Sequence, residues 1–196
     1  MMLNTKLVNM LSDGAVGLVA LHFKELTMFN GAVIMGYQGI GKTTVANDID
    51  IVIDFESSLM KYPDGTRPEK WEKIYCRQAI ELAKNNKIVF ISSHECVQKE
   101  LSNYHAYEDS KVWVGAIAPW YSLRQKWLDN LEARYRDTGM SKDHYALINA
   151  ERGFEQQIRT LSSNPSFTTI FLYNTSYDLS NILSTLCSIM NIDISI

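Results

Sequence analysis

The chain has 196 residues, a formal net charge of -3 and 21% charged residues, with 46% hydrophobic residues. This length and composition predict one globular domain that is large enough to bury a substantial core. The charge gives no reason to expect a surface for a polyanion, so nucleic acid is not an expected partner. The cysteines (Cys76, Cys96 and Cys187) have no metal-binding spacing, and we expect free thiols in a cytoplasmic protein. No apolar run reaches the ~18 residues needed to span a membrane, and no secretion signal is expected.

Residues 1–27 come before the first predicted strand and are interpreted as an N-terminal extension, with the main domain at 28–196. Two helices are plausible in the extension, at 5–11 and 16–26. The sequence leaves open whether this segment packs on a sheet edge, forms a homodimer contact or is partly mobile.

The segment GYQGIGKTT, residues 36–44, follows the apolar run AVIM and fits the pattern G-x-x-x-x-G-K-[ST]. Glycines let the backbone turn around a phosphate, and the N–H groups of the loop and of the following helix then face the anion. Lys42 is expected to reach the β- and γ-phosphates, and the Thr43 hydroxyl is expected to hold Mg²⁺. The expected nucleotide-binding residues of this segment are Gly36, Gly39, Gly41, Lys42, Thr43 and Thr44.

Short apolar runs alternate with segments of helical spacing along the rest of the chain. Strands are predicted at 32–35, 51–54, 87–91, 111–117 and 167–173. Helices are predicted from residue 43 onward and at 71–85, 97–104, 120–135, 142–161 and Leu179–Met190. This alternation predicts an α/β, three-layer α/β/α fold of the P-loop NTPase type, with a five-stranded parallel sheet and a small helical lid. Ligands of such sheets bind at the carboxyl ends of the strands.

The second predicted strand ends in VIDFESS. Asp54 and Glu56 alternate just beyond the sheet, where carboxylates can hold Mg²⁺, orient an acceptor hydroxyl or take its proton. The alternative is a simple turn at the strand end, for which Asp and Ser are common residues. We expect Thr43 and Asp54 as the metal-binding pair, and a first helix of barely two turns because Asp54 follows Lys42 so closely.

The third predicted strand ends in ISSHE, where many phosphate-loop ATPases would place an Asp. Its absence argues against a motor or switch ATPase. Ser92, Ser93 and His94 stand there instead, and small hydroxyl groups could line an acceptor pocket. His94 could contact the acceptor or cap the next helix. The polar segment 61–70 (KYPDGTRPEK) could add Arg67 as a phosphate ligand, or could be an exposed loop.

The segment WYSLRQKWLDNLEARYRDTG, residues 120–139, carries several basic residues on or just after one helix. Arginines brought over the site by a lid would stabilise the charge of a moving phosphoryl group. We favour this role for Arg134 and Arg136, while Arg124 could equally lie on a solvated helix face. Asn174, after the fifth strand, could contact the adenine of ATP or cap the last helix.

The segments GYQGIGKTT, VIDFESS, IVFISSHE and ARYRDTG together resemble the small phosphate-loop kinases of the adenylate kinase and shikimate kinase type. More narrowly, they look like nucleoside-monophosphate-kinase-like proteins of bacteriophages of Gram-positive hosts. The similarity covers about residues 30–190. It implies ATP and Mg²⁺ at residues 36–44, an acceptor site lined by Asp54, Glu56 and residues 57–71, and lid arginines at Arg134 or Arg136. A clear paired-arginine lid motif is missing, and the second strand follows the loop unusually closely.

The function that follows from this resemblance is transfer of the γ-phosphoryl of ATP to a (deoxy)nucleoside monophosphate. A metabolite hydroxyl or a polynucleotide 5′ end is an alternative acceptor. A third hypothesis is a protein that binds a nucleotide without turnover and acts as a regulator.

Overall fold

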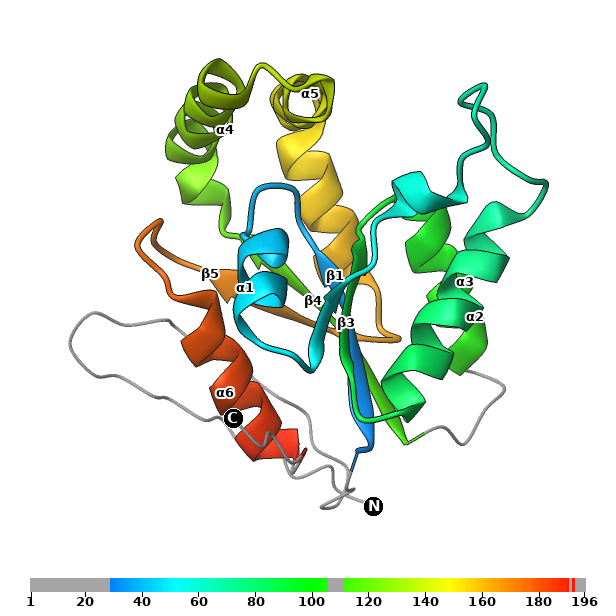
Figure 1. Ribbon diagram of the computed structural model, residues 1–196. Coiled ribbons are helices and arrows are strands. Elements are labelled where there is room, and N and C mark those ends of the chain that lie inside the picture. Colours follow the sequence, from blue (N-terminus) through cyan, green and yellow to red (C-terminus); the bar gives the residue numbers. More distant parts are fainter. Residues whose placement is uncertain (1–28, 106–110, 191, 193–196) are drawn as a thin grey trace.

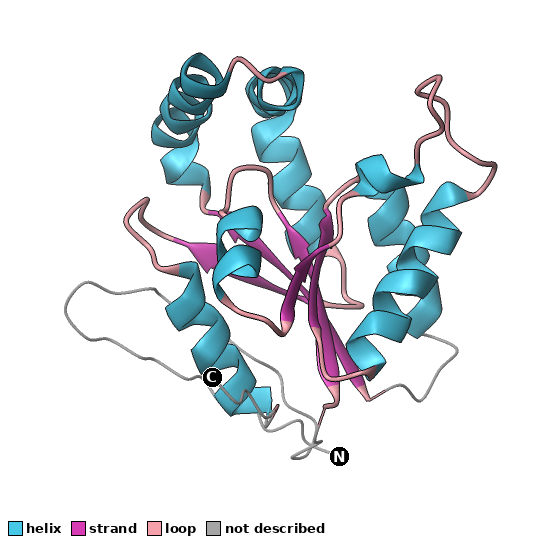
Figure 2. Ribbon diagram, in the orientation of Figure 1, coloured by secondary structure: helices cyan, strands magenta, loops and turns pink. Residues whose placement is uncertain are grey.

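The computed structural model describes residues 29–105, 111–190 and 192 (Figures 1 and 2). Its centre is a five-stranded, all-parallel sheet with the strand order β2-β3-β1-β4-β5. The strands are β1 (Gly31–Gly36), β2 (Val52–Asp54), β3 (Ile88–Ser92), β4 (Val112–Pro119) and β5 (Thr168–Leu172). The α/β fold with five parallel strands that the sequence predicts is confirmed.

The strands form where the sequence has short, continuous apolar runs. Every residue of β1 and β4 is buried, as expected for central strands that are covered on both faces. In the register of the sheet, Gly36 pairs with both Ser92 and Ile117, and Asp54 pairs with Phe90. The segments that follow β1, β2 and β3 therefore leave the sheet at one edge.

Helices cover both faces of this sheet. They are α1 (Lys42–Asp48), α2 (Trp71–Lys84), α3 (Glu95–His105), α4 (Arg124–Thr138), α5 (Ser141–Ser163) and α6 (Leu179–Met190), with short 3-10 turns at Ser57–Met60 and Tyr121–Leu123. Figure 1 shows α2 and α3 on one side of the sheet and α1 and α6 on the other, which gives the three predicted layers. The described helices include none that is long and apolar enough to cross a membrane.

Helix α4 and the first part of α5 pack against each other at the carboxyl ends of the strands, at the top of Figure 1, and the rest of α5 runs down beside the sheet. Gly139 separates them with a left-handed backbone (φ 62°), so the chain reverses within a few residues. This pair occupies the place of the predicted helical lid. The predicted extension at 1–27 lies outside the described residues.

Candidate active site

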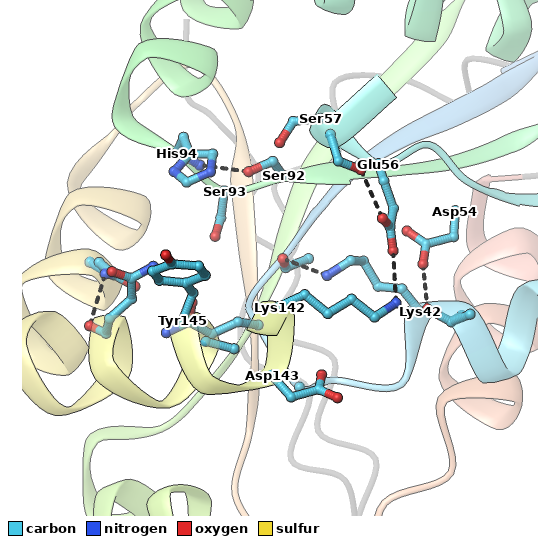
Figure 3. Close-up of a pocket in the computed structure, with 18 of the residues that line it drawn as sticks. Lys42, Asp54, Glu56, Ser57, Ser92, Ser93, His94, Lys142, Asp143 and Tyr145 are labelled. Atoms are coloured by element: carbon cyan, nitrogen blue, oxygen red, sulfur yellow. Dashed lines mark hydrogen bonds and ion pairs between the residues drawn. The ribbon is translucent and has the colours of Figure 1, made fainter. Parts of the chain in front are cut away.

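A cavity of about 1110 Å³ opens at the carboxyl ends of the strands (Figure 3). Its walls come from four parts of the chain: the phosphate loop (residues 36–44), the segment after β2, the segment after β3, and the α4–α5 pair. A parallel α/β sheet places ligands at this edge. The position of the cavity therefore agrees with the position expected from the sequence.

The phosphate loop has the backbone that its glycines allow. Gly39 and Gly41 have positive φ angles of 83° and 90°, which L-residues with a side chain rarely adopt. A Cβ on Gly36 would lie 2.5 Å from Cδ of Lys42, so the lysine side chain fills the space that a larger residue would need. The loop joins β1 to α1, which is the strand-loop-helix context that the motif requires.

Lys42 folds back over this loop, and its Nζ donates to the carbonyl oxygen of Gly36 at 3.3 Å. The residue is half-buried, and the surrounding protein partly desolvates its ammonium group. That desolvation lowers the pKa of Lys42, while the carboxylates of Asp54 and Glu56 act in the opposite direction and Arg134 adds to the lowering. The charges of all three residues are thus close enough to act on the lysine.

Asp54 and Thr43 meet beside the loop. The Thr43 hydroxyl donates to Asp54 Oδ2 at 2.6 Å, and Asp54 Oδ1 is buried with no hydrogen-bond partner. A hydroxyl and a carboxylate with a free oxygen are the hard oxygen donors that Mg²⁺ prefers. Within residues 29–105 and 111–190, no group of three or more His, Cys, Asp or Glu side chains could hold a metal. The donor set therefore fits a cation that takes most of its ligands from phosphates and water.

Glu56 bridges the cavity from the end of β2 to the start of α5. Its carboxylate accepts a hydrogen bond from Ser58 at 2.9 Å and lies 3.6 Å from Nζ of Lys142 (Figure 3). Lys142 is a site residue that the sequence reasoning missed. In the sequence, Lys142 is only a basic residue at the start of a predicted helix. That position does not indicate whether its side chain points into the cavity or toward solvent.

The predicted lid arginines occupy different surroundings. Arg134 lines the cavity, and its Nη2 lies 2.6 Å from Oδ1 of Asp143, a carboxylate that is only 2% exposed. Thr138 donates to the other oxygen of Asp143 at 2.6 Å. Arg136 instead pairs with Glu132 at 2.6 Å, with a side chain that is 72% exposed, and it does not line this cavity. The structure thus brings Arg134 to the loop and leaves Arg136 at the surface.

Two other predicted residues also lie apart from the cavity lining. Arg124 donates to the backbone oxygen of Glu151 at 3.2 Å and is not among the residues that line the cavity. Asn174 follows β5 and is not among the residues that line the cavity, whereas Thr44 is. Roles in catalysis or adenine binding for these residues stay predictions.

Arg67 also lines the cavity. Its guanidinium stacks over the ring of Trp71, 3.9 Å from the ring centroid, and its Nη2 donates to the side chain and backbone of Ser57 at 3.3 and 3.4 Å. The Nε atom of Arg67 is buried without a hydrogen-bond partner. Stacking on an aromatic ring holds the planar guanidinium in one orientation, which suits recognition of a phosphate or carboxylate.

The segment after β3 supplies a further part of the cavity lining. Gln98, on α3, is only 3% exposed; its Nε2 donates to the backbone oxygen of Ser93 at 2.8 Å. A carbonyl can only accept, so the amide nitrogen must face Ser93, and the buried Oε1 is left without a partner. Gln98 was not predicted from the sequence, because one glutamine in an amphipathic helix carries no signal of its own.

His94 and Ser92 lie where the sequence placed them, at the edge of this cavity. The backbone N–H of His94 is 3.4 Å from the Ser92 hydroxyl. His94 is exposed at the cavity edge, but nearby protein still desolvates its imidazole and lowers its pKa. The positive charges of Arg67, Lys42 and Lys61 lower the pKa of His94 further. The same charges would attract an anionic ligand.

Tyr75 ties the ends of β2 and β3 together. Its hydroxyl donates to the carbonyl oxygen of Phe55 and accepts a hydrogen bond from the backbone N–H of Ser92 at 3.1 Å. Its ring stacks against that of Phe55 with centroids 5.0 Å apart. This fully buried tyrosine therefore holds together the segment after β2, which carries Glu56, and the segment after β3, which carries Ser93 and His94.

No protein-family model matches the chain, and no curated protein matches it. Among solved structures, a gluconokinase from Sinorhizobium meliloti is 14% identical with a TM-score of 0.46, and the match covers 84% of this chain and 93% of the gluconokinase. An uncharacterized protein from Eubacterium ventriosum is 9% identical with a TM-score of 0.44, and the match covers 84% and 98% of the two chains. At these identities the likeness concerns the fold alone.

Proposed function

We propose that this chain is an ATP-dependent phosphotransferase whose acceptor is a small anionic molecule, most simply a nucleoside monophosphate or deoxynucleoside monophosphate. One observation carries the proposal. The phosphate loop, with Lys42 and the Thr43–Asp54 pair, opens into the same cavity as a second polar wall formed by Arg67, His94 and Gln98. Two sets of ligand-binding groups on one cavity suit a reaction between two bound substrates.

The phosphate loop supplies the donor half. The glycines expose backbone N–H groups to the triphosphate, and Lys42 is placed to neutralise the β- and γ-phosphates. Thr43 and Asp54 would hold Mg²⁺, which when bound neutralises charge on the phosphate oxygens. Arg134, which is held by its ion pair with Asp143, adds a second positive charge near Lys42.

The acceptor half carries positive charge and exposed polar atoms. Arg67, Lys61 and Lys142 line it, and each would attract a phosphate or carboxylate group. The buried Oε1 of Gln98 has no partner within the protein and would suit a hydrogen-bond donor on the acceptor. A nucleoside monophosphate has both an anionic group and N–H donors on its base, and this match supports it over an uncharged acceptor.

The reaction proposed here moves one phosphoryl group. An acceptor oxygen forms a bond to the γ-phosphorus while the bond from that phosphorus to the β–γ bridging oxygen breaks, and ADP leaves with the electron pair. Lys42 and Arg134 stabilise the negative charge that spreads over the moving group. A phosphate acceptor needs no base; a hydroxyl acceptor would lose its proton to Asp54 or Glu56, which is the chemistry of the alternative metabolite or polynucleotide kinase.

The experiment is ADP release from ATP and Mg²⁺ with a panel of ribo- and deoxyribonucleoside monophosphates, together with gluconate, shikimate and a 5′-hydroxyl oligonucleotide. Acceptor-dependent ADP with one or a few monophosphates is the expected result. Lys42→Ala is the matched variant and should lower that rate by about three orders of magnitude. ADP formed only with a hydroxyl acceptor would replace the proposal with the alternative kinase. Tight ATP binding with no ADP from any acceptor would favour the regulator.

A further inference from the structure

Helix α4 lies directly against the phosphate loop. Trp127, Leu131 and Arg134 are spaced i, i+4 and i+7, and therefore share one face of the helix. A Cβ on Gly39 would lie 2.8 Å from Cδ2 of Leu131 and 3.4 Å from Nε1 of Trp127, so the loop and this helix are in close contact there. Arg134, at the far end of the same face, lines the cavity. One helix thus contacts both the tip of the loop and the site.

Trp127 makes the polar part of this contact. Its indole N–H donates to the backbone oxygen of Gln38 at 2.9 Å, across 89 residues of sequence. The residue is 2% exposed; its ring lies edge-on to Tyr37, with centroids 6.4 Å apart, and is stacked with Tyr177 at 6.1 Å. The indole is therefore fixed on three sides, and its single donor is directed at the loop.

We infer that Trp127 is a positioning residue for the phosphate loop, a role that rests on the proposed nucleotide binding by that loop. The C=O and N–H of a trans peptide point in opposite directions, and the described chain contains no cis peptide. Because the Gln38 carbonyl points at Trp127, the Gly39 N–H points away from α4 and is available to a phosphate. Gly39 and Gly41 make other orientations of these peptides accessible. The indole hydrogen bond selects one orientation before the nucleotide binds.

The alternative is that Trp127 only fills the core beside α4. Trp127→Phe separates the two roles, because it keeps an aromatic ring and removes the N–H. We expect this variant to bind a non-hydrolysable ATP analogue with Mg²⁺ about fivefold more weakly in calorimetry, the loss that corresponds to one net hydrogen bond. The KM of the acceptor should stay unchanged, because the opposite wall of the cavity is untouched. A loss of packing alone would lower the folded fraction and leave the affinity of the folded molecules unchanged.

Trp113→Phe is the matched control. Trp113 is also buried, but it lies on β4 with its ring over Gly115, away from the loop. The Trp113→Phe variant should bind the ATP analogue with the affinity of the wild type. If Trp127→Phe fails to fold, 3-benzothienylalanine at position 127 replaces the N–H by sulfur and keeps the shape of the ring, with the same expected loss of affinity.

The outcomes separate this inference from the proposed function. Wild-type affinity in both variants at position 127 would overturn the positioning role and leave the kinase proposal in place. A wild-type protein that binds no ATP analogue would overturn the nucleotide-binding role of the loop itself, and the positioning role with it. A fivefold loss confined to position 127 supports the inference even where no acceptor has been found.

Discussion

The Thr43 hydroxyl lies 2.6 Å from Oδ2 of Asp54, and this hydrogen bond joins the first turn of α1 to the end of β2. The short loop between these two elements brings the hydroxyl and the carboxylate together. One carboxylate oxygen is engaged and the other is buried without a partner. If the proposed metal binds here, Thr43 Oγ1 and the unpaired Asp54 Oδ1 are the protein oxygens that this pair offers it.

We expect Thr43→Val to lower turnover by at least about 100-fold, because it keeps the size of the side chain and removes the oxygen that would hold Mg²⁺. Thr43→Ser keeps that oxygen and should retain most of the activity. The measurement is the initial rate as a function of Mg²⁺ concentration, with the valine variant needing more metal for half-maximal rate. Equal metal dependence in the two variants would remove Thr43 from the metal site.

The ion pair of Arg134 with Asp143 should affect both the stability of the fold and the rate of turnover. A second substitution, at Asp143, separates these two effects. Arg134→Met leaves the Asp143 carboxylate buried with Thr138 as its remaining side-chain partner. We expect a loss of about 1 to 3 kcal/mol in the free energy of unfolding, measured with urea. It should also lower turnover, because a positive charge leaves the cavity. Adding Asp143→Asn removes the unpaired charge, so the double variant should regain stability but not turnover.

Arg136→Met is the surface comparison for the same experiment. Its pair with Glu132 is exposed and should contribute at most about 0.5 kcal/mol. If Arg136→Met lowers turnover as strongly as Arg134→Met, Arg136 must reach the substrates in a closed form of the α4–α5 pair. The role that the sequence predicted for Arg136 would then hold despite its exposed position.

The sequence was sufficient for the phosphate loop and the sheet because both depend on local patterns. The glycines of the loop, the apolar run of β1 and the start of α1 at Lys42 are adjacent in the chain, and the predicted strands all occur. The boundaries differ by a few residues: the predicted helix at 97–104 is found as Glu95–His105, and the 3-10 turn Ser57–Met60 was not predicted. Such short turns carry no periodicity from which to infer them.

The residues in and beside the cavity that the sequence did not indicate depend on contacts between distant elements. Lys142 reaches Glu56 across the cavity, and Trp127 reaches Gln38 across 89 residues. Their positions follow from how α4 and α5 sit on the sheet, which hydrophobic spacing does not determine. The same reason explains why the sequence did not distinguish the surroundings of Arg134 from those of Arg136. They are two residues apart on one helix and therefore point in different directions, and the sequence alone did not say which of them lines the cavity in this structure.

We expect His94 to give the free energy of unfolding a small dependence on pH. Its pKa is lowered in the folded protein, so the unfolded chain takes up a proton first as the pH falls below about 6.5, the ordinary value for histidine. Folding is therefore favoured above that pH, and this part of the stability is lost as the pH falls through 6.5 toward the folded-state pKa. His94→Gln should show a smaller loss of unfolding free energy between pH 7.5 and 5.5 than the wild type. An equal loss in both proteins would mean that His94 titrates in the fold as it does in water.

Substitution of Gln98 tests whether the wall formed by Arg67, His94 and Gln98 binds the acceptor. The Nε2 of Gln98 is held by the Ser93 carbonyl, so its buried Oε1 is a hydrogen-bond acceptor of fixed direction that an N–H or O–H donor of the ligand would match. We expect Gln98→Leu to lower kcat/KM for the best acceptor of the panel by about 10- to 100-fold, the effect of one buried hydrogen bond, while the affinity for ATP stays unchanged.

The comparison acceptor for Gln98 is a base analogue that lacks the donor group. The wild type should discriminate against it, and Gln98→Leu should treat it and the natural acceptor alike, because the oxygen that distinguishes them is gone. Discrimination that survives in the leucine variant would place the base elsewhere in the cavity. In that case the free oxygen of Gln98 would have to be satisfied by water, and the wall formed by Arg67 and His94 would bind only the anionic group of the acceptor.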